Sequence, residues 1–502
     1  MENLEALLHG FAIAVSLYHI ALMLIGVLLG ILVGVLPGLG APNGVSLLLP
    51  LTFGMPPVSA IILLSSMYWG ALFGGSVTSI LFNIPGEPSS VATTFDGYPM
   101  ARDGRPTTAL ATAFGSAAFG ALVGVVLITL LASWVAKVAL AFGPPEYFAV
   151  YFLAFASFVG MGGSPAIKTV VSLAIGFAIA AIGIDTVSGS VRLTMGIDEL
   201  VKGVSFVVAV MGLFGIGELM IAVEGELHVK AISSKVDWGE VLRTVVELPR
   251  HGWALLRSAA IGCWMGITPG GPTAASFMSY GIAKRFSRRG RNFGNGEPEG
   301  IIAPETADHA AGTSALLPML SLGIPGSATA AVMMGGLMIW GLNPGPMLFI
   351  EQKEFVWGLI ASMYLGNIVA VVLVLLTVPI FAALMRVPFF IIAPMIFIVC
   401  VVGAYSVSNS YLDVVLMMGF GVLGYLFKKL NYPLAPLVLA IVIGDKAEDA
   451  FRQAMLMSQG SLGIFFSNTL VATLIAAGIA LLLLPLALAL IGVHRRLARI
   501  DE

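Results

Sequence analysis

Apolar stretches follow one another along nearly the whole chain, and they constrain its fold more than any other feature. The longest, such as 107–142 and 355–385, exceed the roughly 17–25 residues that a helix needs to cross the hydrocarbon of a bilayer. Others, such as 311–324 and 434–444, are too short to cross as one regular helix. Because lipid offers the backbone no hydrogen bonds, we expect the short pieces to be half-spans, hairpins or buried segments.

The scarcity of charge excludes a water-soluble protein. Apolar residues make up 58% of the 502 residues and Asp, Glu, Lys and Arg only 10%, against about 45–50% and about 25% in globular domains. A soluble chain would need more charge to cover its surface, whereas a lipid bilayer solvates apolar side chains. We therefore predict an all-α integral membrane protein with about ten to twelve transmembrane helices.

Other features exclude several kinds of function. No basic tract with interleaved aromatic residues occurs, so nucleic acid is not an expected partner. The two cysteines, Cys263 and Cys400, both lie in apolar runs, which excludes a disulfide framework and a cysteine metal site. No P-loop motif occurs, so the chain is not expected to use ATP. The acidic N-terminus does not resemble a cleaved signal peptide, so we expect the first helices to be retained.

Basic loops set the expected orientation. The loop KRFSRRGR, residues 284–291, carries five basic residues and no acid, and the C-terminal tail carries Arg495, Arg496 and Arg499. Both are expected in the cytoplasm, which makes the C-terminus cytoplasmic. The stretch 225–257 is also basic on balance and predicts an amphipathic helix at the interface. If both flanks of 258–283 are cytoplasmic, this segment is a re-entrant hairpin.

Two kinds of Pro/Gly break occur in both halves of the chain. The segments LLGILVGVLPGLGAPNGVSLLLPL and IGCWMGITPGGPTAASFMSYGIA each have two apolar arms around a break. At an offset of 232, His19, Gly30, Gly34, Pro37 and Gly38 match His251, Gly262, Gly266, Pro269 and Gly270. At an offset of 240, SILFNIPGEPSS aligns with LSLGIPGSATAA, and Pro85, Gly86 and Pro106 match Pro325, Gly326 and Pro346. Two breaks in the same order indicate a duplication.

The duplication predicts three regions. Residues 1–224 form a first half, with a hairpin around 37–43 and a broken element around 83–90. Residues 225–257 form a polar interfacial connector. Residues 258–502 form a second half, with a hairpin around 268–273, a broken element around 323–329 and the C-terminal helices. Loop charge favours an inverted arrangement of the two halves.

Short, interrupted apolar segments at corresponding places in two halves are typical of a transporter with its site at mid-membrane. Helix starts freed by the breaks can hold a carboxylate, and freed carbonyls and hydroxyls can hold a cation. We expect transport by alternating access, as an elevator with the hairpins on the moving part. A passive channel and a membrane-embedded enzyme are the alternatives. An enzyme would use Glu305, Asp308 and His309 as its acid/base groups. In a transporter we expect these three residues to cap a helix or to form a proton or cation relay.

The candidate ligands lie at the breaks, where Glu87 also stands beside Pro85 and Gly86. For substrate they are Gly38, Asn43, Ser46, Asn83, Pro85, Gly86, Ser89, Gly270, Thr273, Ser276, Pro325, Gly326 and Ser327. For the cation they are Asn43, Ser76, Thr78, Thr273, Thr313 and Ser314. Hydroxyls in membrane helices also bond to their own backbone, which is the alternative for each of them.

At these motifs the chain resembles the large membrane subunit of the tripartite tricarboxylate transporter family. The similarity rests on GILVGVLPGLGAPNG, WGALFGGSVTSILFNIPGEPSSVATTFDGYPMARDGRP, GITPGGP and EGIIAPETADHAAGTSALLPMLSLGIPGS. The resemblance implies a multi-pass permease of the bacterial inner membrane, not an enzyme, that works with a small membrane subunit and a periplasmic solute-binding protein. It implies uptake of citrate or another carboxylate by symport with Na⁺ or H⁺, without a tightly bound cofactor.

Overall fold

The structure, a computed structural model, describes residues 2–36, 39–161, 165–185, 188–224, 236–268, 271–384 and 389–498. Nearly all of these residues are helical, which confirms the all-α prediction. The one sheet in the described part of the chain pairs β1 (Gly183–Ile184) with β2 (Val191–Arg192) in antiparallel order.

Several of the helices suit a bilayer by length and composition. Within the described residues, five are long and apolar enough to cross it: α2 (Leu17–Val35), α4 (Pro57–Phe82), α6 (Pro106–Ala139), α18 (Lys353–Leu384) and α20 (Tyr411–Lys429). Shorter apolar helical segments cover Ala166–Ala180, Phe206–Ile221, Ala328–Ile339, Ala393–Ser408 and Thr469–Leu483. Long and short apolar helices therefore coexist, as the uneven apolar stretches predict.

The chain divides into two compact units, which we describe separately. Unit 1 comprises Met1–Ala139, Val207–Ile267 and Gly271–Leu426, and unit 2 comprises Leu140–Phe206, Thr268–Gly270 and Phe427–Glu502. Besides the long helices, unit 1 contains α1 (Glu2–Ala14), α3 (Gly40–Leu48), α5 (Val91–Arg102), most of α9 (Phe206–Val210), a π-helix (Met211–Ile216), α10 (Gly217–Glu224), α11 (Trp238–Glu247), α12 (Gly252–Ile267), α13 (Gly271–Phe286), α14 (Pro298–Ser314), α15 (Leu316–Leu322), α16 (Ala328–Ile339), α17 (Leu348–Glu351) and α19 (Phe389–Ser408).

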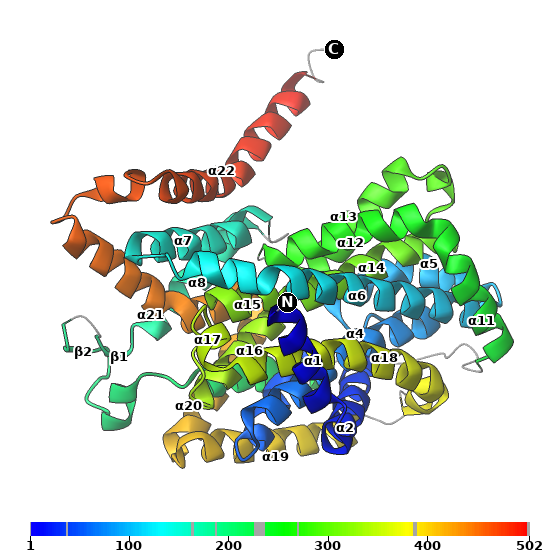
Figure 1. Ribbon diagram of the computed structural model, residues 1–502, viewed down its shortest axis with the longest axis horizontal. Coiled ribbons are helices and arrows are strands. Elements are labelled where there is room, and N and C mark those ends of the chain that lie inside the picture. Colours follow the sequence, from blue (N-terminus) through cyan, green and yellow to red (C-terminus); the bar gives the residue numbers. More distant parts are fainter. Residues whose placement is uncertain are drawn as a thin grey trace. The chain divides into compact units, whose positions relative to one another are not determined.

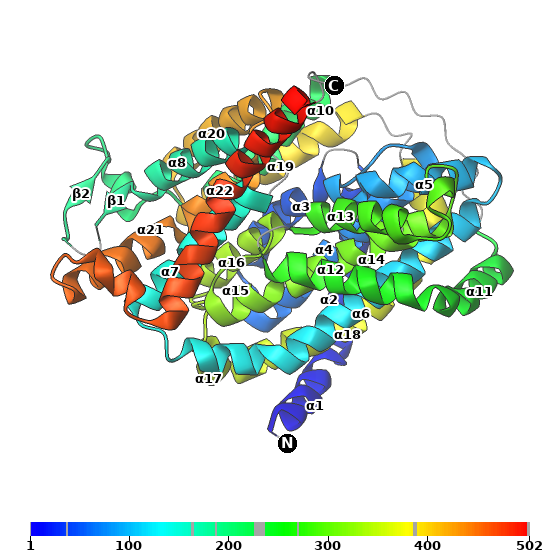
Figure 2. The ribbon, with the colours of Figure 1, turned by 90° about the horizontal axis from the view of Figure 1, so that it is seen from above.

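Two helical hairpins stand at the predicted breaks. In the first, α3 folds back so that Gly44 lies against the side chain of Val33 in α2. In the second, α12 and α13 lie side by side, as Figure 1 and Figure 2 both show. The returning arms begin at Gly40 and Gly271, whose φ angles of +62° and +67° favour glycine.

Close glycine contacts repeat between the halves. Glycine in the outgoing arm lets the next long helix approach, since Gly34 lies against the backbone of Ala71 and Gly266 against that of Ala311. These two contacts are related by the offsets of 232 and 240. A side chain on any of these glycines would overlap a backbone atom, so the same packing is built twice.

The long helix that follows the second break in each half packs against the other half. Helix α6, from the first half of the chain, packs along α14 of the second half, and α18 of the second half packs along α4 of the first. Each half thus completes the core of the other. A broad apolar cluster, which includes Phe73, Phe114 and Val374, fills the space between these helices.

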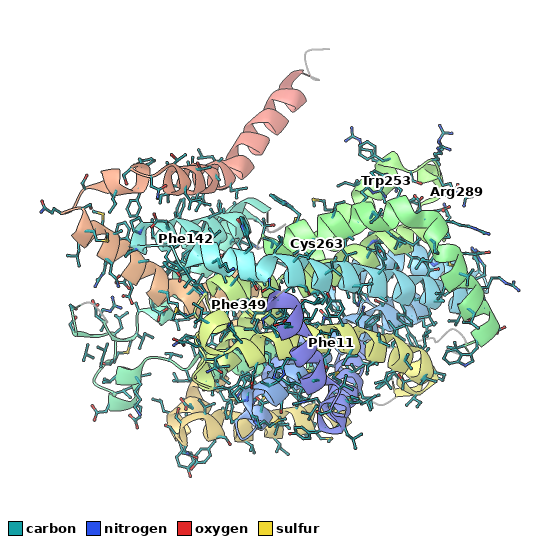
Figure 3. The ribbon with its side chains drawn as sticks, viewed as in Figure 1. Phe11, Phe142, Trp253, Cys263, Arg289 and Phe349 are labelled. Atoms are coloured by element: carbon teal, nitrogen blue, oxygen red, sulfur yellow. The ribbon has the colours of Figure 1, made fainter. Side chains whose placement is uncertain are left out.

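An amphipathic helix, α11, begins in the polar connector at Asp237, which caps its first turn by accepting N–H bonds from Gly239 and Glu240. It packs on α6 through buried Val241 and leaves Leu242 and Val246 exposed. The adjoining α12 exposes Trp253, and Figure 3 shows Trp253 and Arg289 projecting outward. Exposed aromatic and basic side chains of this kind are typical of a membrane interface.

Unit 2 consists of α7 (Pro144–Met161), α8 (Ala166–Ala180), the β1–β2 hairpin, α21 (Leu434–Met457), α22 (Thr469–Ala498) and short 3-10 turns at Asp198–Lys202 and Leu462–Phe466. Helix α21 packs on α7 and α8, and α22 packs on α7. The hairpin is tied to α21 by ion pairs: Arg452 lies 2.6 Å from Asp185, and Arg192 lies 2.8 Å from Glu448.

Candidate functional site

In the first broken element, α4 ends at a left-handed C-cap, and the helical conformation resumes as α5. Asn83 takes φ +58°, and the Ile84 N–H donates to the carbonyl of Thr78. Pro85 cannot continue the helix. Beyond this non-helical stretch, the Ser90 hydroxyl donates to the Glu87 carbonyl and accepts from the Glu87 N–H. These two hydrogen bonds stabilise the turn at Pro88–Ser90.

The second broken element has the same construction. Gly323 takes the left-handed conformation of Asn83, and Ile324 donates to the carbonyl of Pro318. The helix restarts at Ser327, whose hydroxyl accepts the N–H of Ala330 as an N-cap for α16. All of these positions are related to the first element by the offset of 240.

Each broken element reaches a returning hairpin arm of its own half, with different chemistry. In the first half, Glu87 accepts the N–H of Ala41 at the start of α3, and its carboxylate lies against Gly40. In the second half, Ser327 and the carbonyl of Gly326 lie nearest to Gly271, at the start of α13. The first helix start therefore holds one of the protein's own carboxylates, whereas the second faces a serine.

The broken elements also reach the long helix of the opposite half. The Ser89 hydroxyl donates to Oδ2 of Asp308 in α14, over 3.1 Å. The corresponding pair at the offset of 240 is Thr329 with Tyr68 in α4, and the Tyr68 hydroxyl lies beside Ser327 and Thr329 without a well-formed hydrogen bond to any described residue. The offset of 240 therefore relates the contact Ser89–Asp308 to the contact Thr329–Tyr68, as a two-fold axis between the halves would. In both contacts a broken element meets the long helix of the opposite half, and the two breaks converge on one centre.

Two further polar groups of α14 join this centre. Both oxygens of Glu305 lie 2.8 Å from the Ser76 hydroxyl, and Oε1 accepts from Thr93 over 2.5 Å. The His309 ring lies 4.4 Å from that of Phe73, and its Nδ1 lies 3.2 Å from the Glu305 carbonyl. These contacts join α4, α5 and α14, which come from both halves of the sequence.

The centre is rich in acids. Glu87, Glu305 and Asp308 are at most 5% exposed, and among the described ion pairs none joins them to Lys or Arg. Among the described ion pairs, the one basic partner of these acids is His309, whose Nδ1 lies 3.9 Å from a carboxylate oxygen of Glu305 and 3.9 Å from one of Asp308. Carboxylates at membrane depth are costly and usually functional. No group of three or more His, Cys, Asp or Glu within the described ranges has the geometry of a metal site.

Part of the predicted site comes together. Six of the candidates lie at or beside the convergent breaks and are buried: Ser76, Gly86, Ser89, Pro325, Gly326 and Ser327. Pro85 of the first break is half-buried. Ser76 and Ser89 bind carboxylates there. Gly86 and Gly326 allow the breaks to touch the carbonyls of Gly34 and Gly266.

The other candidates lie elsewhere or bond locally. The hydroxyls of Ser46 and Thr78 donate to the carbonyls of Asn43 and Gly75 on their own helices, and Ser314 lies 3.4 Å from the carbonyls of Cys263 and Ala311. Thr273 and Asn83 are exposed, Asn43 is buried in α3, and Ser276 and Thr313 are buried with no hydrogen bond to a described residue. Gly38 and Gly270 lie outside the described residues.

Besides Glu305, Asp308 and His309, which the sequence suggests as a relay, four residues at the centre were not among the candidate ligands: Tyr68, Phe73, Glu87 and Thr93. For Glu87 the sequence carries a signal, an acid inside an apolar segment beside a Pro/Gly break. Thr93 is one of several hydroxyls near the first break that the sequence does not distinguish from one another. Tyr68 and Phe73 carry no signal, because tyrosine and phenylalanine at helical positions are ordinary packing residues.

Comparisons with known proteins agree with this architecture. A family model described as the tripartite tricarboxylate transporter TctA family matches residues 20–439. The chain is similar to an "Uncharacterized 52.8 kDa protein in TAR-I ttuC' 3'region" of Agrobacterium vitis, with 36% identity over 97% of each chain. It is also similar to an "Uncharacterized protein in TAR-II ttuC' 3'region" of that organism, with 35% identity over 45% of this chain and 93% of the relative. No solved structure matches the chain.

Proposed function

Since the chain belongs to the tripartite tricarboxylate transporter TctA family, we propose that it is the permease subunit of a binding-protein-dependent secondary transporter. It imports a citrate-like carboxylate in symport with a cation. The observation that carries this proposal is the convergence of two broken helices and two hairpin arms, from both halves of the chain, on one buried polar centre. Such a centre is the arrangement that secondary transporters use for substrate and coupling ion.

The substrate is held at the start of α13. The first half gives the precedent inside the protein, because a backbone N–H at the start of α3 binds the carboxylate of Glu87. At the start of α13 the nearest side chain is that of Ser327, so a serine lies where the first half has the carboxylate of Glu87. The buried hydroxyl of Tyr68, beside Ser327, supplies a further donor. Substrate is thus bound mainly by backbone N–H groups and hydroxyls.

Alternating access exposes this centre to either side of the inner membrane. The hairpin arms carry the helix starts, so movement of the hairpins carries the substrate, as in an elevator. The small membrane subunit completes the complex in the bilayer, and the periplasmic binding protein delivers the carboxylate and does much of the selection. Energy comes from a Na⁺ or H⁺ gradient.

Uptake by proteoliposomes tests the proposal. The vesicles contain the permease, the small membrane subunit and the binding protein, and they receive radiolabelled citrate or one of several dicarboxylates under an imposed Na⁺ or pH gradient. We expect one carboxylate to accumulate above its external concentration, and vesicles without the binding protein serve as the control. Equilibration without accumulation would indicate a channel, chemical conversion of the label would indicate an enzyme, and exclusion of every carboxylate would contradict the proposal.

A further inference from the structure

Three buried carboxylates share the centre without a matching positive charge. Asp308 interacts electrostatically with Glu305 and with Glu87. Like charges in a poorly solvated site cannot all be ionised, so at least one of the three must be neutralised by a proton or another cation. His309 gives little compensation, because its Nδ1 faces the carbonyl of Glu305.

The three carboxylates differ in the donors that they receive. Glu305 accepts from the hydroxyls of Ser76 and Thr93. Glu87 accepts a backbone N–H at the positive end of α3, and helix starts stabilise anions. Asp308 accepts only from Ser89, at Oδ2, and its buried Oδ1 receives no hydrogen bond from the described residues. Asp308 is therefore the acid whose negative charge is stabilised least.

An independent group of the opposite half points at the same place. The Tyr68 hydroxyl is buried, has no hydrogen-bond partner among the described residues, and lies next to Gly312. Gly312 is one turn beyond Asp308 on the same face of α14. The Nε2 atom of His309, also fully buried, likewise lacks a described partner. Oδ1 of Asp308 is thus accompanied by two further buried atoms, the Tyr68 hydroxyl oxygen and Nε2 of His309, that lack a described hydrogen-bond partner. A cation would interact favourably with the lone pairs of such atoms.

We propose that Asp308 is the binding site for the coupling cation, a single monovalent ion that neutralises its carboxylate, with the Ser89 and Tyr68 hydroxyls as neighbouring ligands. Na⁺ and H⁺ share this chemistry, and Glu87 and Glu305 differ from Asp308 in having more donors of their own. The inference rests on the proposed function for its role in transport, but the binding itself does not depend on the substrate.

Thermal unfolding of the purified permease, without substrate, tests the binding directly. Wild-type protein is heated in increasing NaCl against choline chloride at fixed pH, and in choline chloride at decreasing pH. A ligand that binds only the folded state raises the unfolding temperature, so one of the two series should do so. Asp308→Asn, which mimics the neutralised acid, should abolish that rise. A rise with Na⁺ identifies the sodium ion, and a rise only with acid identifies the proton.

Matched variants separate the site from general damage. Asp96→Asn changes another buried acid, which accepts from Tyr280 and from the N–H groups of Gly294, Gly296 and Glu297, and should keep the cation response. Ser89→Ala should weaken cation affinity by about tenfold, in the usual range for coupling effects, whereas Ser46→Ala, whose hydroxyl bonds only to its own helix, should not. Asp308→Asn that keeps the wild-type response, or wild-type protein that responds to neither cation, would overturn the inference.

Transport assays then connect the site to coupling. In proteoliposomes, Asp308→Asn should lose at least about tenfold of gradient-driven accumulation. Gradient-driven accumulation at the wild-type level in Asp308→Asn would also overturn the inference. If the wild-type protein shows a cation response in unfolding but transports no carboxylate, the proposed function fails and the cation site stands.

Discussion

The two broken elements have the same backbone and different chemistry. Asn83 and Gly323 end their helices alike, Gly86 and Gly326 touch corresponding carbonyls, and both elements reach the start of a hairpin arm. At the next position, however, the first half has Glu87 and the second has Ser327. The comparison teaches that the two halves share their packing but differ in this side chain: a carboxylate occupies the helix start of the first half, and a serine lies beside that of the second, where we propose that the substrate binds.

Ser327→Glu should have the largest effect, because it gives the second half the chemistry of the first. A carboxylate attached beside the start of α13 competes with the substrate at the millimolar or higher effective concentration of a tethered group. We therefore expect carboxylate uptake to fall by about a hundredfold, measured as initial rates in proteoliposomes with equal amounts of folded protein.

Ser327→Ala is the control for this exchange. It removes the N-cap of α16 at a cost of about 1 kcal/mol and leaves the anion site open, so most uptake should remain. The interpretation of the second half as the substrate site would be wrong if Ser327→Glu transported as well as Ser327→Ala.

Gly86→Ala and Gly326→Ala should have similar effects on stability, because the packing is shared. The new methyl group would overlap the carbonyl of Gly34 in one variant and of Gly266 in the other. Overpacking of this kind costs about 1–3 kcal/mol, so both variants should unfold at a lower temperature in detergent. Gly281→Ala offers a matched control, since a methyl group there meets no neighbour. Destabilisation of one variant only would show that the halves pack less alike than their contacts indicate.

Much of the fold was predictable because backbone requirements leave local signals. A left-handed cap, a close helix approach and a helix stop each demand Gly, Asn or Pro, and these residues recur at the offsets of 232 and 240. The chemistry was less predictable. Ser89 and Ser46 are both serines beside breaks, yet one hydroxyl binds Asp308 and the other its own helix. Only the three-dimensional packing, which brings residues 219 positions apart together, distinguishes them.

Glu87→Ser should sharpen the comparison from the other side. The variant removes the carboxylate that caps α3 and interacts electrostatically with Asp308. Loss of the cap should destabilise the protein by about 1–2 kcal/mol, partly offset by relief of repulsion. Thermal unfolding measures the net change. The vacated helix start should then bind citrate, so added citrate should stabilise Glu87→Ser more than it stabilises the wild-type protein. Equal stabilisation would contradict the role of Glu87 as an internal substitute for substrate.

The smallest effect is expected at the left-handed cap of the first half. The caps of the two halves differ in side chain but not in backbone. Asn83→Gly keeps the φ of +58° available and removes an exposed side chain, so the free energy of unfolding should change by less than about 0.5 kcal/mol. Gly323→Asn should cost about 1 kcal/mol or more, because a Cβ atom there lies 2.6 Å from the carbonyl of Pro344. Thermal unfolding of both variants measures the difference. If the two variants unfold with the same change in stability, the Pro344 segment moves aside to admit the asparagine. If Gly323→Asn is the less stable, the two halves differ in the packing around their caps as well as in having Glu87 or Ser327 at the next position.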